Sequence, residues 1–192
     1  MTTDSPRYAG FWPRSGALLL DLLITLPLVA LVFWGDSHYR LFSLFYFVPG
    51  TLFGLFYGVY LVKRFGGTPG KLIMGVRIRK LNGEPVGYRE AFLRYFPDFI
   101  LGTLAWVAVL YSLFHMTDSE YHALSVHDRT MRLIELAPFW YEPVQMAQPI
   151  WVWGEIIVLL TNRKRRALHD FIAGTVVIWT PAILAPRPKI SY

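Results

Sequence analysis

Asp21 lies inside the first long apolar stretch of the sequence, residues 16–34, and Arg14 lies seven residues before Asp21. The stretch is long enough to cross a bilayer, where an ionised side chain costs about 2.5–3.5 kcal/mol and by default marks a functional site. Seven residues are almost two helical turns, so the two side chains project from nearly the same face, about 10 Å apart along the axis. Each side chain therefore needs a partner from elsewhere in the chain, and Asp21 could be an exchangeable proton or cation site.

Glu155 is a second carboxylate within an apolar stretch, residues 144–161. Together with Asp21 it could form a two-carboxylate cation site, because hard cations take oxygen ligands. The alternative is that Glu155 forms a hydrogen bond to a neighbouring helix or to another protomer. Lys71 ends a glycine-rich run, residues 66–71, but this run lacks the spacing and the preceding buried strand of a phosphate-binding loop.

Histidines and acids gather in one stretch, residues 115–128, in a pattern that could suggest a metal site. No two of these histidines are four residues apart, which is the spacing that places two ligands on one helix face. The sequence therefore predicts a solvated outer loop here, with no metal site and no cofactor. The sequence has no cysteine and no evident nucleophile–base pair, so we expect a protein that is not an enzyme. The stretch contains His115, Asp118, Glu120, His122, His127 and Asp128.

The composition indicates an integral membrane protein. Hydrophobic residues make up 54% of the 192 residues, and the mean hydropathy is +0.38. Only 17% of the residues are charged, against about 25% in ordinary soluble domains. The net charge of +6 comes from basic residues that flank apolar stretches rather than from a stripe on a polar domain. We therefore expect the partner to be a lipid bilayer and not a nucleic acid.

Four apolar stretches approach or reach the length of about 17–25 residues that a membrane-spanning helix needs. A fifth stretch, residues 171–185, is shorter and carries Pro181, so we interpret it as interfacial or re-entrant. The sequence thus predicts an all-α membrane protein with four transmembrane helices. These helices cover residues 16–34, 41–62, 99–116 and 144–161.

Positive charge orients the predicted helices. Sixteen of the nineteen Lys and Arg residues lie in the N-terminal segment, in the connection 63–98 or after the fourth helix. Because positively charged loops stay in the cytoplasm, both termini and this connection are predicted to be cytoplasmic, in a prokaryotic inner membrane. The connection 118–143 is then an outer loop. The basic run Arg163–Arg166 is expected to attract anionic lipids.

Two segments share a plan of amphipathic helical turn, glycine and short strand. Gly75 lies between one such turn and the alternating strand 76–79, and Gly174 lies between another turn and strand 175–178. The two strands could pair on the cytoplasmic side, because both follow helices that end there. The alternative is that two amphipathic segments look alike by chance. Superposing the glycines aligns Gly70 with His169 and Lys71 with Asp170.

Three stretches, residues 8–21, 66–83 and 166–177, resemble the RDD family of small prokaryotic integral membrane proteins. The family is named for one arginine and two aspartates. The resemblance implies a single RDD-like transmembrane domain, 1–192, with its core at 8–180. It also implies cation/proton antiport or another small-solute transport for some members. The three residues of the family's name map onto Arg14, Asp21 and Asp170.

These three residues would meet on the cytoplasmic side if the third stretch folds back under the first helix. As a transport site, Asp21 would exchange a proton or a cation, with Arg14 and Asp170 as a gate. As a clamp, an Arg14–Asp170 ion pair would only fix the C-terminal motif to the first helix. The sequence leaves both interpretations open.

The function predicted first is therefore a small-solute or cation/proton transporter that uses Asp21. The alternative is a non-transporting scaffold or accessory subunit that docks a partner through its cytoplasmic motifs. Four helices make a small bundle for an enclosed path, which favours a homo-oligomer or a partner membrane protein. The candidate functional residues are Arg14, Asp21, Lys71, Glu155, His169 and Asp170.

Overall fold

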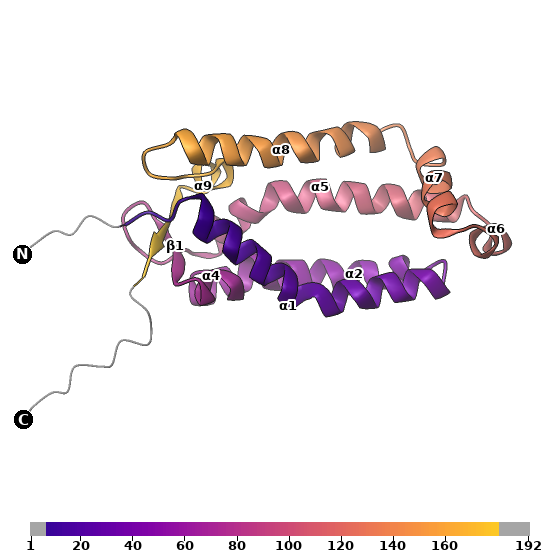
Figure 1. Ribbon diagram of the computed structural model, residues 1–192, viewed down its shortest axis with the longest axis horizontal. Coiled ribbons are helices and arrows are strands. Elements are labelled where there is room, and N and C mark those ends of the chain that lie inside the picture. The colour runs from indigo at the N-terminus through magenta and orange to yellow at the C-terminus, as the bar shows by residue number, and fades with distance from the viewer. Residues whose placement is uncertain (1–6, 181–192) are drawn as a thin grey trace, which may run out of the picture.

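The computed structural model describes residues 7–180 of the chain. Four helical rods run side by side along the long axis of the molecule (Figure 1). Each belongs to a helical segment that is long and apolar enough to cross a membrane. The rods are α1 (Phe11–His38), the continuous series α2 (Phe42–Leu55), η1 (Phe56–Tyr60) and α3 (Leu61–Phe65), then α5 (Tyr88–Phe114) and α8 (Tyr141–Thr161).

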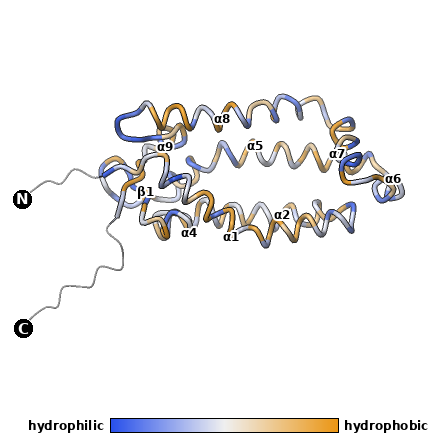
Figure 2. The backbone as a smooth tube through the Cα atoms, viewed as in Figure 1, coloured by the Kyte–Doolittle hydropathy of each residue, from blue (hydrophilic) through white to orange (hydrophobic). Residues whose placement is uncertain are grey.

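Apolar residues recur along most of the length of these helices (Figure 2), and many of their large side chains are exposed. Large side chains such as Leu18, Phe45 and Trp153 are 69%, 76% and 63% exposed. Polar groups instead gather at the two ends of the bundle, which Figure 2 colours blue. This distribution is expected of helices that face lipid, because apolar side chains need no cover there. The four predicted spanning helices are thus present.

The third helix begins at Tyr88, well before the predicted start at residue 99. Apolar stretches are bounded by charges in the sequence, and Arg94 and Asp98 marked that boundary. In the structure both residues are helical, and other elements supply their partners. The fourth helix likewise begins at Tyr141 rather than at residue 144.

A two-stranded antiparallel sheet closes one end of the bundle. It pairs β1 (Val76–Lys80) with β2 (Thr175–Trp179) in a register that sets Ile78 opposite Val177. A short helix precedes each strand, α4 (Pro69–Ile73) before β1 and α9 (Leu168–Ile172) before β2.

The two helix–strand units have the same order of elements, and their strands pair antiparallel. Gly75 and Gly174 join helix to strand with φ angles of 71° and 65°, which glycine adopts without strain. Each glycine carbonyl accepts a hydrogen bond from the residue just beyond the other strand, at 2.9 Å from Thr180 and 3.3 Å from Leu81. The two units therefore contact each other in equivalent ways.

Both outer edges of this sheet are covered by other parts of the chain. On the β2 edge, Ala9 N–H donates to the Val177 carbonyl at 2.9 Å, and Trp179 N–H donates to the Arg7 carbonyl at 2.9 Å. On the β1 edge, Ile78 N–H donates to the Gly66 carbonyl at 2.6 Å. The sheet thus presents no long free edge for another strand.

Residues 171–179 complete α9 and form β2, so this part of the predicted interfacial or re-entrant stretch is no re-entrant span. Residues 181–185 of that stretch lie outside the described residues. Residues 171–179 do not form a re-entrant segment because the apolar residues after Gly174 form a strand that pairs with β1.

At the opposite end of the bundle, the predicted outer loop is largely helical. It contains α6 (Asp118–Ala123) and α7 (Val126–Glu135), whose first turns are capped by Thr117 and Ser125. Tyr121 packs against Leu113 and Met116 at the end of α5. The polar composition predicted a solvated loop, but Tyr121 and three leucines of this segment, Leu124, Leu133 and Leu136, pack against the end of the bundle.

Candidate functional site

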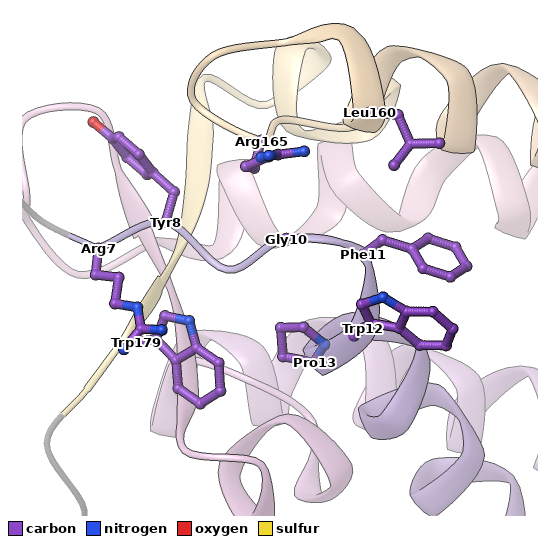
Figure 3. A pocket seen from close by; sticks show the side chains of 9 residues that line it. All are labelled: Arg7, Tyr8, Gly10, Phe11, Trp12, Pro13, Leu160, Arg165 and Trp179. Atoms are coloured by element: carbon purple, nitrogen blue, oxygen red, sulfur yellow. The ribbon is translucent and has the colours of Figure 1, made fainter.

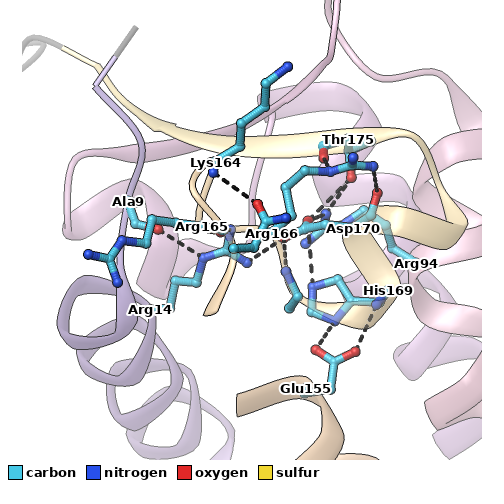
Figure 4. Close-up of polar contacts among 12 residues, drawn as sticks. Ala9, Arg14, Arg94, Glu155, Lys164, Arg165, Arg166, His169, Asp170 and Thr175 are labelled. Carbon is cyan, nitrogen blue, oxygen red and sulfur yellow. Dashed lines mark hydrogen bonds and ion pairs between the residues drawn. The ribbon is translucent and has the colours of Figure 1, made fainter. Parts of the chain in front are cut away.

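A buried ion-pair network surrounds Asp170, which is completely inaccessible to solvent (Figure 4). Its Oδ2 accepts hydrogen bonds from Arg14 Nη1 at 2.7 Å and from the Ala167 backbone N–H at 3.0 Å. Its Oδ1 contacts Arg94 Nη1 and the Thr175 hydroxyl. One carboxylate thus joins α1, α5, α9 and β2.

The network keeps Asp170 ionised. Burial alone would raise the pKa of this carboxyl, but the guanidinium groups of Arg94 and Arg14 outweigh burial and leave the pKa well below its ordinary value. Arg14 also donates to the carbonyls of Ala9 at 3.2 Å and Arg165 at 2.7 Å. The pairing of Arg14 with Asp170 that the sequence predicted is present, and its geometry is that of a clamp.

Asp21 takes no part in this network, so the predicted meeting of all three residues is wrong for Asp21. Its carboxylate accepts hydrogen bonds from the Tyr57 hydroxyl at 2.5 Å, the Thr68 hydroxyl at 2.5 Å and the Gly70 backbone N–H at 2.7 Å. It therefore binds the first turn of α4 to α1. A Cβ atom at Gly70 would lie only 2.2 Å from the Ala17 carbonyl oxygen, so α4 can approach this closely only with glycine.

Glu155 makes the corresponding contact to α9. Its Oε1 accepts a hydrogen bond from the His169 backbone N–H at 2.8 Å, and its Oε2 contacts His169 Nδ1. Gly70 and His169 are the residues that the repeat aligns, so each short helix is held by a carboxylate from a long helix. Asp21 and Glu155 bind different short helices, and the predicted two-carboxylate site is not formed.

The surroundings of His169 favour the neutral form of its imidazole. Burial lowers the pKa of this side chain, and the charge of Arg94 lowers the pKa further, against the opposing effect of Glu155. Because Nδ1 faces the carboxylate of Glu155, this nitrogen carries the ring proton. A proton on the second ring nitrogen, Nε2, would add a positive charge beside two cavities that His169 lines.

Two cavities lie between the long helices near the sheet. The first, the Tyr57 cavity, has about 380 Å³ and is lined by Asp21, Tyr57 and Tyr95 among others. The second, the Trp151 cavity, has about 440 Å³ and is lined by Trp151 and Glu155 among others. The residues that line both cavities are Leu18, Lys71, Asp98 and His169.

Lys71 and Asp98 have unusually few partners at this shared wall. Within residues 7–180, no carboxylate oxygen lies within ion-pair distance of Lys71 Nζ, and its side chain forms no hydrogen bond. Asp98 accepts one hydrogen bond, from Trp151 Nε1 at 3.0 Å, and forms no ion pair with the described residues. A lysine and an aspartate thus share two cavities without pairing with each other.

The wall of the Tyr57 cavity includes an irregular helical turn. Residues Phe56–Tyr60 form a π-helix within the second rod, a feature that is common at functional sites. Gly58 lies in this turn, and a Cβ atom there would come within 2.7 Å of the Tyr95 ring. The close packing brings Tyr57 and Tyr95 to the same cavity.

A larger hollow of about 610 Å³ opens at the sheet end of the bundle (Figure 3). Aromatic side chains dominate it, and the guanidinium groups of Arg7 and Arg165 lie at its margin. Arg7 stacks over the Trp179 ring at 5.5 Å. The composition resembles a membrane interface, where aromatic and basic side chains meet lipid headgroups.

Sequence reasoning missed Arg94 and Asp98, the two charges at the start of the predicted third helix. The two residues are four positions apart on α5, so they lie on the same helix face. That spacing could have identified them as candidate functional residues. Lys71, Glu155 and His169 were candidates, and the structure brings all three to the Trp151 cavity.

Four long apolar helices closed by a two-stranded sheet define a class of small multi-helix membrane proteins. The model of the RDD family matches residues 8–174, and the chain belongs to that family. It is also similar to the uncharacterized protein YckC of Bacillus subtilis, with 36% identity over 91 residues. That match covers 45% of this chain and 56% of YckC, so the chain spans little more than half of this relative. No solved structure matches.

Proposed function

We propose that this protein is a proton-coupled transporter of small solutes in a prokaryotic inner membrane. The observation that carries the proposal is the wall shared by the two cavities, where Lys71 and Asp98 have no ion-pair partner among the described residues. Both residues belong to helical segments apolar enough to cross a membrane, and ionisable side chains in such segments persist where they bind or move charge. Asp98 replaces Asp21 as the exchangeable carboxylate, because three donors already hold Asp21.

The charges around the cavities support proton coupling. With His169 neutral, four carboxylates face three basic side chains, so one negative charge is left over when all of them are ionised. A proton on His169 or a cation in the cavity would balance it, and either event changes the electrostatic field at Lys71 and Asp98. The carboxylates are Asp21, Asp98, Glu155 and Asp170, and the basic side chains are Arg14, Lys71 and Arg94.

The proposed orientation places the sheet end of the bundle in the cytoplasm. The chain enters and leaves the described fold at this end, since Trp179 N–H binds the Arg7 carbonyl. The connection 63–98 and the run Arg163–Arg166, which carry most of the basic residues, belong to the same end. The positive-inside rule therefore favours this orientation.

Proton flux in reconstituted vesicles tests the proposal. The full chain would be placed in liposomes that contain a pH-sensitive dye, with an imposed pH gradient and with NaCl, KCl or an amino-acid mixture added outside. We expect at least one addition to collapse the gradient faster than in protein-free liposomes, and Asp98→Asn to remove this effect. Asp118→Asn is the matched control, because Asp118 is 75% exposed at the opposite end.

Two results would overturn the proposal. One is a gradient that decays as in protein-free liposomes under all three additions. The other is a flux that Asp98→Asn leaves unchanged while the variant elutes as a folded protein. The scaffold alternative has less support, because both sheet edges are covered and offer no strand for docking. A homo-oligomer or a partner membrane protein stays a prediction.

A further inference from the structure

We propose that the solute is zwitterionic, an amino acid whose carboxylate binds Lys71 and whose ammonium group binds Asp98. This inference rests on the proposed transport function and adds the chemical class of the substrate. It follows from which charges around the cavities are already neutralised by protein partners and which are left for a ligand.

Lys71 is the basic side chain that is left for a ligand carboxylate. Arg14 is held by Asp170 at 2.7 Å and by two backbone carbonyls. Arg94 is held by Asp170 and by the Thr175 hydroxyl at 2.6 Å. Lys71 has no such contact within residues 7–180, although it lies on α4 between the two cavities. An ammonium group with three free donors is a suitable partner for a carboxylate.

Asp98 is the corresponding carboxylate for a ligand ammonium group. Asp21 accepts three hydrogen bonds, Glu155 is held by His169, and Asp170 is enclosed by two arginines. Asp98 has only the Trp151 indole N–H as a donor. A carboxylate can accept about four hydrogen bonds, so most of the acceptor capacity of Asp98 is free.

A ligand with a single charge would satisfy only half of this site. A simple cation would bind Asp98 and be repelled by Lys71, and a simple anion would bind Lys71 and be repelled by Asp98. Lys71 and Asp98 do not reach each other, because no ion pair joins them. A molecule that carries an ammonium group and a carboxylate group on the same carbon atom offers a counter-charge to both residues at once.

The cavities also limit the side chain of this amino acid. Their volumes of about 380 and 440 Å³ lie in the lower range of ligand sites. Phe53 and Gly54 line the Tyr57 cavity, whereas Trp151 and Ile156 line the Trp151 cavity. Both surroundings favour an apolar side chain over a charged one, since a further charge would have no free partner among the described residues.

Binding of a leucine series to the purified full chain tests this inference. The probes are leucine, 3-methylbutylamine, which lacks the carboxylate, and 4-methylpentanoate, which lacks the amino group. Binding is read from tryptophan fluorescence, because Trp151 contacts Asp98, and from the melting temperature in detergent. We expect leucine to bind at least tenfold more tightly than either analogue.

Variants of Lys71 and Asp98 test which charged group of the ligand each residue binds. Lys71→Gln should weaken leucine binding at least tenfold and should strengthen binding of the amine analogue, because a repelling positive charge is removed. Asp98→Asn should weaken leucine binding equally and should strengthen binding of the carboxylate analogue, because a repelling negative charge is removed. Lys164→Gln and Asp118→Asn are controls that should change neither. The comparison of the three ligands on the unaltered protein stands even where a variant fails to fold.

The outcomes separate this inference from the proposed function. Equal binding of leucine and the amine would indicate a cation site, and equal binding of leucine and the carboxylate would indicate an anion site. Either result overturns the zwitterion proposal. If leucine, alanine and phenylalanine all fail to bind while NaCl or KCl drives an Asp98-dependent proton flux, the inference is wrong and the transport function stands. An absence of any flux overturns the transport function itself.

Discussion

The two aspartates of the family's name hold different parts of the protein. Asp170 is enclosed by Arg14 and Arg94 and fixes α9 and β2 to α1 and α5. Asp21 binds the first turn of α4 through a backbone N–H and two hydroxyl groups. At the residue scale, therefore, both carboxylates are explained by what they hold together, and the free charges are Lys71 and Asp98.

Asp170→Asn should destabilise the protein strongly. The substitution leaves Arg14 and Arg94 as buried charges without a counter-ion, which costs about 3–5 kcal/mol. Thermal unfolding in detergent would measure this loss of stability. The control is Asp118→Asn, which breaks an exposed ion pair with Arg40 and should cost less than about 1 kcal/mol. Equal melting temperatures for the two variants would contradict the assignment of a buried clamp.

Asp21→Asn should impair folding more than flux. The amide of asparagine offers one acceptor oxygen where the carboxylate offers two, so the Thr68 hydroxyl or the Gly70 N–H loses its partner. The expected cost is about 1–3 kcal/mol. The check is a comparison of melting temperature and of flux per folded molecule in liposomes. A stable variant with no flux would restore Asp21 as the transport group.

Acidification should destabilise the protein in two stages. The pKa of His169 is lowered in the folded state, so the unfolded chain binds a proton first as the pH falls below about 6.5. The folded protein is therefore fully stable, as far as His169 is concerned, above about pH 6.5. It loses stability as the pH falls from there toward the lower pKa that His169 has in the folded state. The pKa of Asp170 is also lowered, so its contribution is lost only below about pH 4. Melting temperatures between pH 7.5 and 5.5 should fall less in His169→Gln than in the unaltered protein.

At the element scale, the sequence predicted more of the fold than of the site. Alternating residues and glycines identified both strands, because a strand pattern and a turn are local properties. The early start of α5 was missed, because Arg94 and Asp98 bound the apolar stretch in the sequence, and their partners Asp170 and Trp151 come from far along the chain. The Arg14–Asp170 contact was predictable from the family's motif, and the spacing of Arg94 and Asp98 was a usable signal, but the sequence did not show which residues would bind them.

Gly70→Ala should separate α4 from α1. The added methyl group would lie 2.2 Å from the Ala17 carbonyl oxygen and 2.8 Å from the Asp21 carboxylate, so the short helix must move and lose its hydrogen bond. We expect a loss of about 1–3 kcal/mol. Gly102→Ala is the matched control, because nothing lies within 4 Å of the new atom and alanine favours a helix. Thermal unfolding of both variants would check the difference.

On the scale of the whole molecule, the two ends of the bundle differ in their role. One end contains the sheet, the ion-pair network and the cavities, and the other is closed by α6 and α7 (Figure 1). The apolar outer surface between them fixes how the protein lies in a bilayer. The site is therefore reached more directly from the sheet end, which the proposed orientation places in the cytoplasm.

The aromatic hollow at the sheet end should retain anionic lipid. Arg7 and Arg165 lie at its margin, and Trp12 is 81% exposed beside them (Figure 3). Native mass spectrometry of protein from mixed lipids should find phosphatidylglycerol retained over phosphatidylcholine. Arg165→Gln should reduce this preference by about fivefold, since each basic residue contributes about 1 kcal/mol near a charged surface. Arg132→Gln, at the opposite end and paired with Glu120, should leave it unchanged.

The long separation between Asp170 and its two arginines has a consequence for biosynthesis. The ribosome produces Arg14 156 residues and Arg94 76 residues before the carboxylate that neutralises them. At about 5–20 residues per second, Arg14 precedes its counter-ion by about 8–30 s and Arg94 precedes it by about 4–15 s. A nascent chain that has not yet reached residue 170 therefore contains Arg14 and Arg94 without the carboxylate that neutralises both of them.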